Sequence, residues 1–130
     1  MDSACRASKG TRLLVVEEEA HEDAVVVRVK GDVDSSTVDE LTARLTAALQ
    51  LAATHPSRTV VIDLQPVTFF GSAALNAMLE CHEEGRDAGT AVRLVADHDQ
   101  VLRPIQVTEL DRIFNIYPTL SDALAREQQR

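Results

Sequence analysis

The sequence is poor in aromatic and in basic residues. Aromatic residues make up 3% of the 130 residues, and tryptophan is absent. There are 13 Lys and Arg residues against 21 Asp and Glu residues, which gives a formal net charge of −8. Nucleic acids and anionic membrane surfaces bind clusters of Lys and Arg. We therefore expect neither as a partner, and we favour a basic or neutral protein surface.

Long hydrophobic runs are also missing. No apolar stretch approaches the length of a membrane-spanning helix, and the first ten residues, MDSACRASKG, are polar and carry no apolar signal-peptide segment. We therefore expect no membrane insertion and a cytoplasmic location. Residues 1–11 lack periodicity and are predicted to form a flexible N-terminal leader, followed by a single domain at residues 12–127.

Motifs for nucleotides, metals and nucleophilic catalysis are absent. The chain has neither GxxxxGK[ST] nor GxGxxG, and the acidic stretches EEEAHED and GDVDSS lack the spacing of a calcium loop. No histidine has a Cys or His neighbour at zinc-ligand spacing, and the sequence assigns none of the histidines as a catalytic base. The four are His21, His55, His82 and His98. We therefore expect no cofactor, no metal and no enzymatic activity.

Cysteine occurs twice, as Cys5 in the leader and Cys81 in a helical stretch. A chain of this size does not need a disulfide to fold, so free thiols are favoured. Cys81 falls on the apolar face of its helix, where it is most simply a small core residue. A redox role shared by Cys5 and Cys81 stays open as the alternative.

The residues that are present favour an α/β fold. Short apolar runs typical of strands alternate with amphipathic stretches typical of helices. The predicted strands are residues 11–19, 24–31, 59–64, 91–96 and 112–118, and the predicted helices begin near residues 36, 72, 97 and 119. Several strands alternate apolar with polar side chains, which indicates one buried face. We predict two layers: a mixed five-stranded sheet with about four helices mainly on one face, in the order β-β-α-β-α-β-α-β-α.

Polar residues and Gly or Pro mark the expected helix ends. Ser36 and Thr37 each precede an acidic residue by three positions, which matches a capping box for the first helix. Ser72 is a natural N-cap for the second helix, and Gly89 a natural stop. Pro104 is expected to end or distort the first turns of the third helix.

The turn before the second helix invites comparison with a nucleophile elbow. That motif, G-x-S-x-G, requires glycine on both sides of Ser72, whereas the chain has Phe70 and Ala74. A hydrolase is therefore not expected. Asp32 and Asp34 follow a strand at the same predicted end of the sheet as Ser72, and function tends to gather at that end of open α/β sheets.

Three stretches together resemble the STAS domain of bacterial anti-sigma factor antagonists. They are VVVRVKGDVDSSTVDELTARL, TVVIDLQPVTFFGSAALNAML and VLRPIQVTELDRIFNIYPTLSDAL, and they occur in the order and spacing of that family across about residues 12–125. The strand-turn-helix of the family reads like D-L-S-x-V-x-F-[IL]-D-S-S-G-L. Asp63, Leu64, Val67, Phe69 and Leu75 match it.

In that family, the first serine after the acidic residue of the turn is phosphorylated by a kinase that is itself the anti-sigma factor. Ser72 takes the position of that serine. Gly71, Ala73 and Ala74 depart from the pattern, because they replace the acidic residue, the second serine and the glycine. The resemblance implies a switch in which the unmodified chain binds an anti-sigma factor of the serine-kinase type and frees a sigma factor, whereas the Ser72-phosphorylated chain does not bind.

The resemblance also implies where the partner binds. The candidate contact residues are Asp32, Asp34, Ser35, Ser36, Phe70, Gly71, Ser72, Ala73 and Asn76. STAS domains serve in transport and stress-signalling assemblies as well. A stand-alone subunit that acts as a passive protein-binding module in such an assembly is therefore the alternative.

Overall fold

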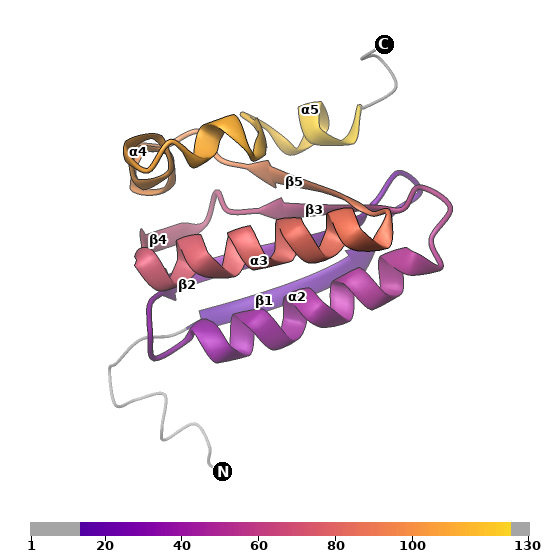
Figure 1. The fold of residues 1–130 in the computed structure, drawn as a ribbon, viewed down its shortest axis with the longest axis horizontal. Helices are drawn as coiled ribbons and strands as arrows, with labels where there is room; N and C mark the ends of the chain where they lie inside the picture. The colour runs from indigo at the N-terminus through magenta and orange to yellow at the C-terminus, as the bar shows by residue number, and fades with distance from the viewer. Residues whose placement is uncertain (1–13, 126–130) are drawn as a thin grey trace.

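The structure is a computed structural model that describes residues 14–125, so the predicted leader and Cys5 lie outside the described residues. Apart from the consecutive strands β1–β2 and β3–β4, strands and helices alternate along the chain (Figure 1). The strands are β1 (Leu14–Ala20), β2 (Val25–Val33), β3 (Thr59–Asp63), β4 (Val67–Phe70), β5 (Ala91–Val95) and β6 (Asn115–Tyr117). The helices are α2 (Val38–Ala53), α3 (Ser72–Ala88), α4 (Asp99–Val107) and α5 (Leu120–Leu124), with a 3-10 helix, η1, at Leu110–Arg112.

The strands form one mixed sheet in the order β1-β2-β3-β5-β6, with β4 paired to β2. β1 and β2 form an antiparallel hairpin, and every other pair is parallel. The α/β class and the mixed sheet are confirmed. The predicted number of five strands is wrong, because the sheet of the described residues has six.

β4 is the strand that the sequence did not reveal. It continues the line of β3 along β2: β3 pairs with residues 25–28, and β4 pairs with residues 31–33 after a register shift between Gly31 and Asp32. Gly31 adopts a φ of 109°, which favours glycine, and its amide donates a hydrogen bond of 3.2 Å to the carbonyl of Pro66. Because Pro66 interrupts the apolar run, the four residues after it carry too short a pattern to predict a strand.

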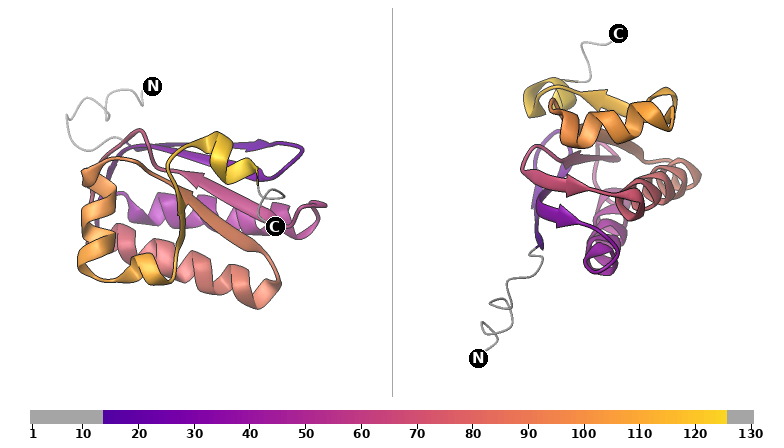
Figure 2. Two further views of the ribbon diagram at one scale, coloured as in Figure 1. Left: turned by 90° about the horizontal axis from the view of Figure 1, so that it is seen from above. Right: turned by 90° about the vertical axis from the view of Figure 1, so that its left-hand side faces the viewer.

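The helices lie mainly on one face of the sheet, as predicted. The main core packs α2, α3 and α4 against that face, with fully buried side chains such as Leu41, Met78, Ile105, Ile62 and Leu94. Figure 2 shows α5 on the opposite side of the sheet from α2 and α3. There Ala123 closes a second, smaller core over Val26, Val61 and Val95.

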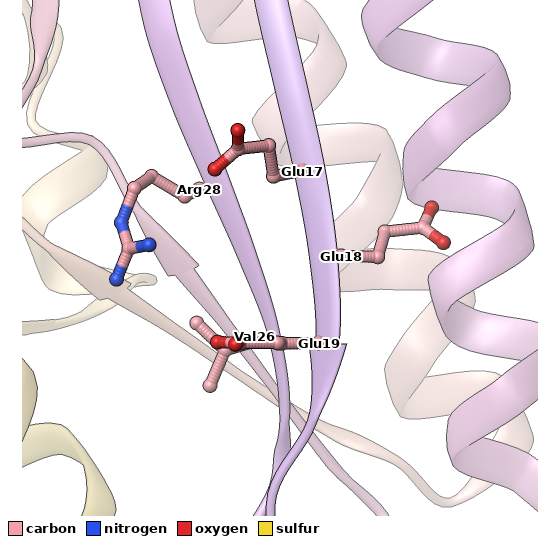
Figure 3. Close-up of a pocket in the computed structure, with 5 residues that line it drawn as sticks. All are labelled: Glu17, Glu18, Glu19, Val26 and Arg28. Atoms are coloured by element: carbon pink, nitrogen blue, oxygen red, sulfur yellow. The ribbon is translucent and has the colours of Figure 1, made fainter.

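α2 also protects the outer edge of the sheet. The guanidinium of Arg44 donates a hydrogen bond of 2.7 Å from Nη2 to the carbonyl of Val16 on β1, and its Nε lies 3.8 Å from Glu18 Oε2. Figure 3 shows Glu18 pointing toward the helix, with Glu17 and Arg28 on the other side of the hairpin. The unpaired backbone groups of an edge strand can pair with a strand of another protein molecule. The bond from Arg44 satisfies one such group, the carbonyl of Val16.

Two predicted helix starts differ from the structure. Thr37 is the N-cap of α2 but makes no capping hydrogen bond, so the predicted capping boxes of Ser36 and Thr37 are wrong. Gly71, and not Ser72, is the N-cap of α3. Pro104 lies within α4 and does not end it, so of the two predicted effects only a distortion of the helix stays a prediction. Gly89 stops α3 in a left-handed conformation, as predicted.

Candidate functional site

The structure brings the β2–α2 loop and the β4–α3 turn together. Asp32 and Val33 of β2 pair with Phe69 and Phe70 of β4, and the amide of Gly71 donates a hydrogen bond of 3.2 Å to the carbonyl of Val33. The hydroxyl of Thr68 donates a hydrogen bond of 2.6 Å to Asp32 Oδ1. The two segments that the sequence singled out therefore form one continuous surface.

The β2–α2 loop is held by its own hydrogen bonds. Asp34 Oδ1 accepts bonds from the amide of Ser36 at 2.8 Å and from its hydroxyl at 2.6 Å. The hydroxyl of Thr37 donates to the carbonyl of Asp32 at 2.9 Å and accepts from the amide of Asp34 at 3.1 Å. Ser35 and Ser36 remain exposed. The loop therefore presents polar groups in a fixed geometry, which lowers the entropy that a partner must remove on binding.

Ser72 is exposed at the first position of α3. Its hydroxyl makes no hydrogen bond with any residue of the described chain, and no side chain of that part caps the helix. The first turn of α3 contains no acidic residue, so the positive end of the helix dipole is not offset there by a carboxylate. Ser72 therefore offers a free hydroxyl at a place that favours a negative group.

Because Gly71 has no side chain, the ring of Phe69 packs against its Cα beside Ser72. A Cβ atom at Gly71 would lie 3.0 Å from Phe69 Cε2 and 3.7 Å from the carbonyl oxygen of Val33. The backbone of Gly71 is extended, with φ of −93° and ψ of −171°, so any residue could adopt it. Phe69 is 47% exposed. An acidic side chain at position 71 would therefore require only a shift of that exposed ring.

Phe70, which we predicted as a contact residue, is buried, whereas its neighbour Phe69 is exposed. Phe70 is only 4% exposed, so its ring supports the turn from below, while the neighbouring Phe69 presents its ring at the surface. Phe69 is thus a contact candidate that we did not predict from the sequence.

A groove between α2 and α3 continues the surface. The predicted residues Ala73 and Asn76 line it, together with Asp39 of α2 and Glu80 of α3. Asp39 and Glu80 were not predicted, although both are charged residues on the same helices as predicted contacts. With Asp32 and Asp34 nearby, they make this side of the site acidic, which suits a basic surface on a partner.

Cys81 is buried in the main core, 3% exposed, as predicted from its helical position. Burial, and secondarily the nearby charge of Glu84, raises the pKa of the Cys81 thiol to about 12. The thiolate is the reactive form of cysteine. Cys81 is therefore poorly suited to redox exchange while the protein is folded.

We expect Cys81 of a Cys5→Ser variant to react with iodoacetamide at about pH 8 more than tenfold more slowly in the folded than in the unfolded protein, because burial withholds the thiolate. Mass spectrometry over time, with and without guanidinium, measures both rates. Equal rates would contradict this expectation. A disulfide between Cys5 and Cys81 in the oxidised wild type would restore the redox alternative.

Residues 14–125 contain neither a cluster of metal-ligating side chains nor a helix that could cross a membrane. No three His, Cys, Asp or Glu side chains between residues 14 and 125 are grouped so that they could hold a metal ion. None of the helices in this range is long and apolar enough to cross a membrane.

Known proteins resemble this chain over most of its length. The STAS domain family model matches residues 16–123. The anti-sigma-F factor antagonist RsfB of Mycobacterium tuberculosis is 33% identical over 107 residues, which cover 80% of this chain and 81% of that protein. RsfA of the same species, also an anti-sigma-F factor antagonist, is 28% identical over 105 residues, which cover 81% and 80%.

Solved structures show the same fold. The crystal structure of an anti-sigma factor antagonist from Mycobacterium paratuberculosis matches with a TM-score of 0.80 and 32% identity, over 90% of this chain and 96% of that one. The anti-sigma factor antagonist SpoIIAA in its unphosphorylated form matches with a TM-score of 0.69 and 18% identity, over 91% and 98%. From the family match, the two relatives and the shared fold, we conclude that this chain belongs to the STAS domain family.

Proposed function

We propose that this chain is an anti-sigma factor antagonist. In its unmodified form it binds an anti-sigma factor of the serine-kinase type and thereby releases a sigma factor. The observation that carries the proposal is the hydroxyl of Ser72, which is exposed beside the β2–α2 loop and makes no hydrogen bond within the described residues. The chain is also 33% identical to the anti-sigma-F factor antagonist RsfB. The proposed role is protein binding in the cytoplasm, without catalysis by this chain.

The proposed binding surface follows the structure around Ser72. It consists of the exposed part of the β2–α2 loop, the ring of Phe69 and the first turns of α3, with Ala73 and Asn76. Its carboxylates favour a basic partner surface. The partner contact is therefore expected to cover Ser72 itself.

The proposed switch is phosphorylation of Ser72 by the anti-sigma factor. Ser72 Oγ attacks the γ-phosphorus of ATP held by that kinase, ADP leaves, and the kinase takes the hydroxyl proton. The phosphate adds about −1.5 to −2 charges, which the N-terminus of α3 tolerates. In a complex, the same group would have to lose its water or lie near Asp32 and Asp34, so binding fails while the fold survives.

The proposal is tested with purified pairs of anti-sigma and sigma factors from the source genome. The chain is expected to displace the sigma factor from one anti-sigma factor and to restore transcription by RNA polymerase in vitro. With that anti-sigma factor and ATP, phosphate is expected on Ser72, located by mass spectrometry. Failure to release any sigma factor would refute antagonism. Release with Ser72 left unmodified would refute only the switch.

A further inference from the structure

A second groove lies between β4 and α4, and of its lining residues the proposed binding surface includes only Phe69. Phe69, Phe70, Pro104 and Val107 form its apolar lining, and Asp99, Gln100 and Arg103 form its polar lining. His98, the N-cap of α4, donates a hydrogen bond of 3.1 Å from Nε2 to the carbonyl of Val67, which holds the start of α4 against β4. The groove therefore has a fixed wall on each side.

The apolar lining is unusually open to solvent. Among the described residues, five large hydrophobic side chains are exposed, and Val107 at 72% and Phe69 at 47% have the highest values. Single exposed hydrophobic residues are ordinary, but two that flank one groove mark a place for an apolar group. Because Phe69 also covers Gly71, the groove is continuous with the proposed Ser72 surface.

The groove holds one carboxylate and one guanidinium, Asp99 and Arg103, whereas the charged residues on the other side of Ser72 are carboxylates. Arg103 is exposed, and within the described chain its guanidinium has no ion pair or hydrogen bond, not even with Asp99 one turn before it on α4. The other side of Ser72 carries Asp39 and Glu80. A guanidinium in this position suits a carboxylate, which it can bind through two parallel hydrogen bonds.

The geometry points to a docking site for the anti-sigma factor in this groove. The occupant is a short partner segment that places a large apolar side chain against Phe69 and Val107, with an Asp or Glu of the same segment on Arg103. This inference rests on the proposed function and adds the chemistry of the second contact. It follows that the partner presents basic residues to α2 and α3 and an acidic, apolar segment to α4.

A second copy of this chain is a poorer occupant. A symmetric dimer places the same patch on both subunits. A symmetric dimer through this groove would also cover the adjacent surface around Ser72. The carboxylates of one subunit would then face the same carboxylates of the other, and like charges across an interface are unfavourable. The acidic segment of a different protein avoids that repulsion.

The test uses the anti-sigma factor that releases its sigma factor in response to the wild-type chain. Val107→Asp and Arg103→Glu are expected to weaken its binding at least about tenfold by biolayer interferometry, as loss of an interface anchor typically does. Leu51→Asp, at an exposed apolar site on the far end of α2, and Arg86→Glu, at the far end of α3, are matched controls and should stay within about twofold. Circular dichroism checks that each variant is folded.

The outcomes separate this inference from the proposed function. If Ser72→Asp abolishes binding but Val107→Asp and Arg103→Glu stay within about twofold of wild type, the groove is not a docking site and the proposed function stands. If no anti-sigma factor binds the wild type, both are wrong. A photo-crosslinker at position 107 should capture a partner peptide that contains Asp or Glu beside an apolar residue. Capture of a basic peptide, or a wild-type dimer that Val107→Asp dissociates, would overturn the inference.

Discussion

Replacing Ser72 with aspartate is expected to weaken binding of the anti-sigma factor at least about a hundredfold while the protein stays folded. An unpaired charge buried in an interface costs about 3 kcal/mol or more, and each 1.4 kcal/mol is a factor of ten in affinity. The fold should tolerate the change because Ser72 is exposed, makes no hydrogen bond within the described chain and lies at a helix N-terminus that lacks acidic residues.

Two further variants separate charge from other effects. Ser72→Asn has nearly the same size as the aspartate variant without its charge, so we expect its affinity within about fivefold of wild type. Ser121→Asp adds the same charge at an exposed position in the first turn of α5, away from the proposed surface, and should bind like wild type. Affinity is measured by isothermal titration calorimetry. A Ser72→Asp protein that binds as tightly as wild type would show that Ser72 lies outside the contact.

Replacing Gly85 with alanine is expected to lower the free energy of unfolding by about 1–2 kcal/mol. A Cβ atom there would lie 2.7 Å from Val92 Cγ2 and 2.9 Å from the carbonyl oxygen of Thr90, both closer than real contacts allow. The Thr90 amide also donates a hydrogen bond of 2.7 Å to Gly85 O, which fixes the backbone where α3 ends against β5. Overpacking of this kind costs about 1–3 kcal/mol or more, and it should exceed the gain of up to about 1 kcal/mol in helix propensity.

Urea denaturation followed by circular dichroism measures this loss. Glu83→Ala, at an exposed position on the same helix, is the control and should change stability by less than about 0.5 kcal/mol. Adding Val92→Ala should cost less in the Gly85→Ala protein than in wild type, because it removes one of the two clashing groups. Stability of Gly85→Ala equal to or above that of wild type would mean that α3 and β5 are not packed this closely.

The main elements could be predicted because their signals are local. Each helix carries an apolar stripe, and β3 is a run of five buried residues. β4 could not, because its pairing with β2 begins where the Gly31 amide bonds to the carbonyl of Pro66, a contact across 35 positions of sequence that no local pattern records. The position of α5 on the opposite face was also hidden, since a five-residue helix has too short a pattern to show which face it covers.

The surface around Ser72 was predicted in outline but not in detail. Strict alternation from Val67 would bury Phe69 and expose Phe70, whereas the structure does the reverse. β4 has four residues and pairs with β2 next to a register shift, so the ordinary period of a strand is not maintained there. The N-cap of α3 is Gly71 and not the predicted Ser72 for a related reason. The amide of Gly71 bonds to the carbonyl of Val33 on β2, and α3 begins directly after Gly71.

The most direct test of the central claim is the footprint of the anti-sigma factor on this chain, measured by NMR chemical-shift perturbation of backbone amides. The proposed function predicts the largest changes in residues 32–36 and 69–76. It predicts little change on the outer face of β1 and β2, where Glu17 and Arg28 line the hollow in Figure 3. A footprint centred on that outer face, with Ser72 and its neighbours unperturbed, would contradict the proposal that Ser72 lies in the partner contact.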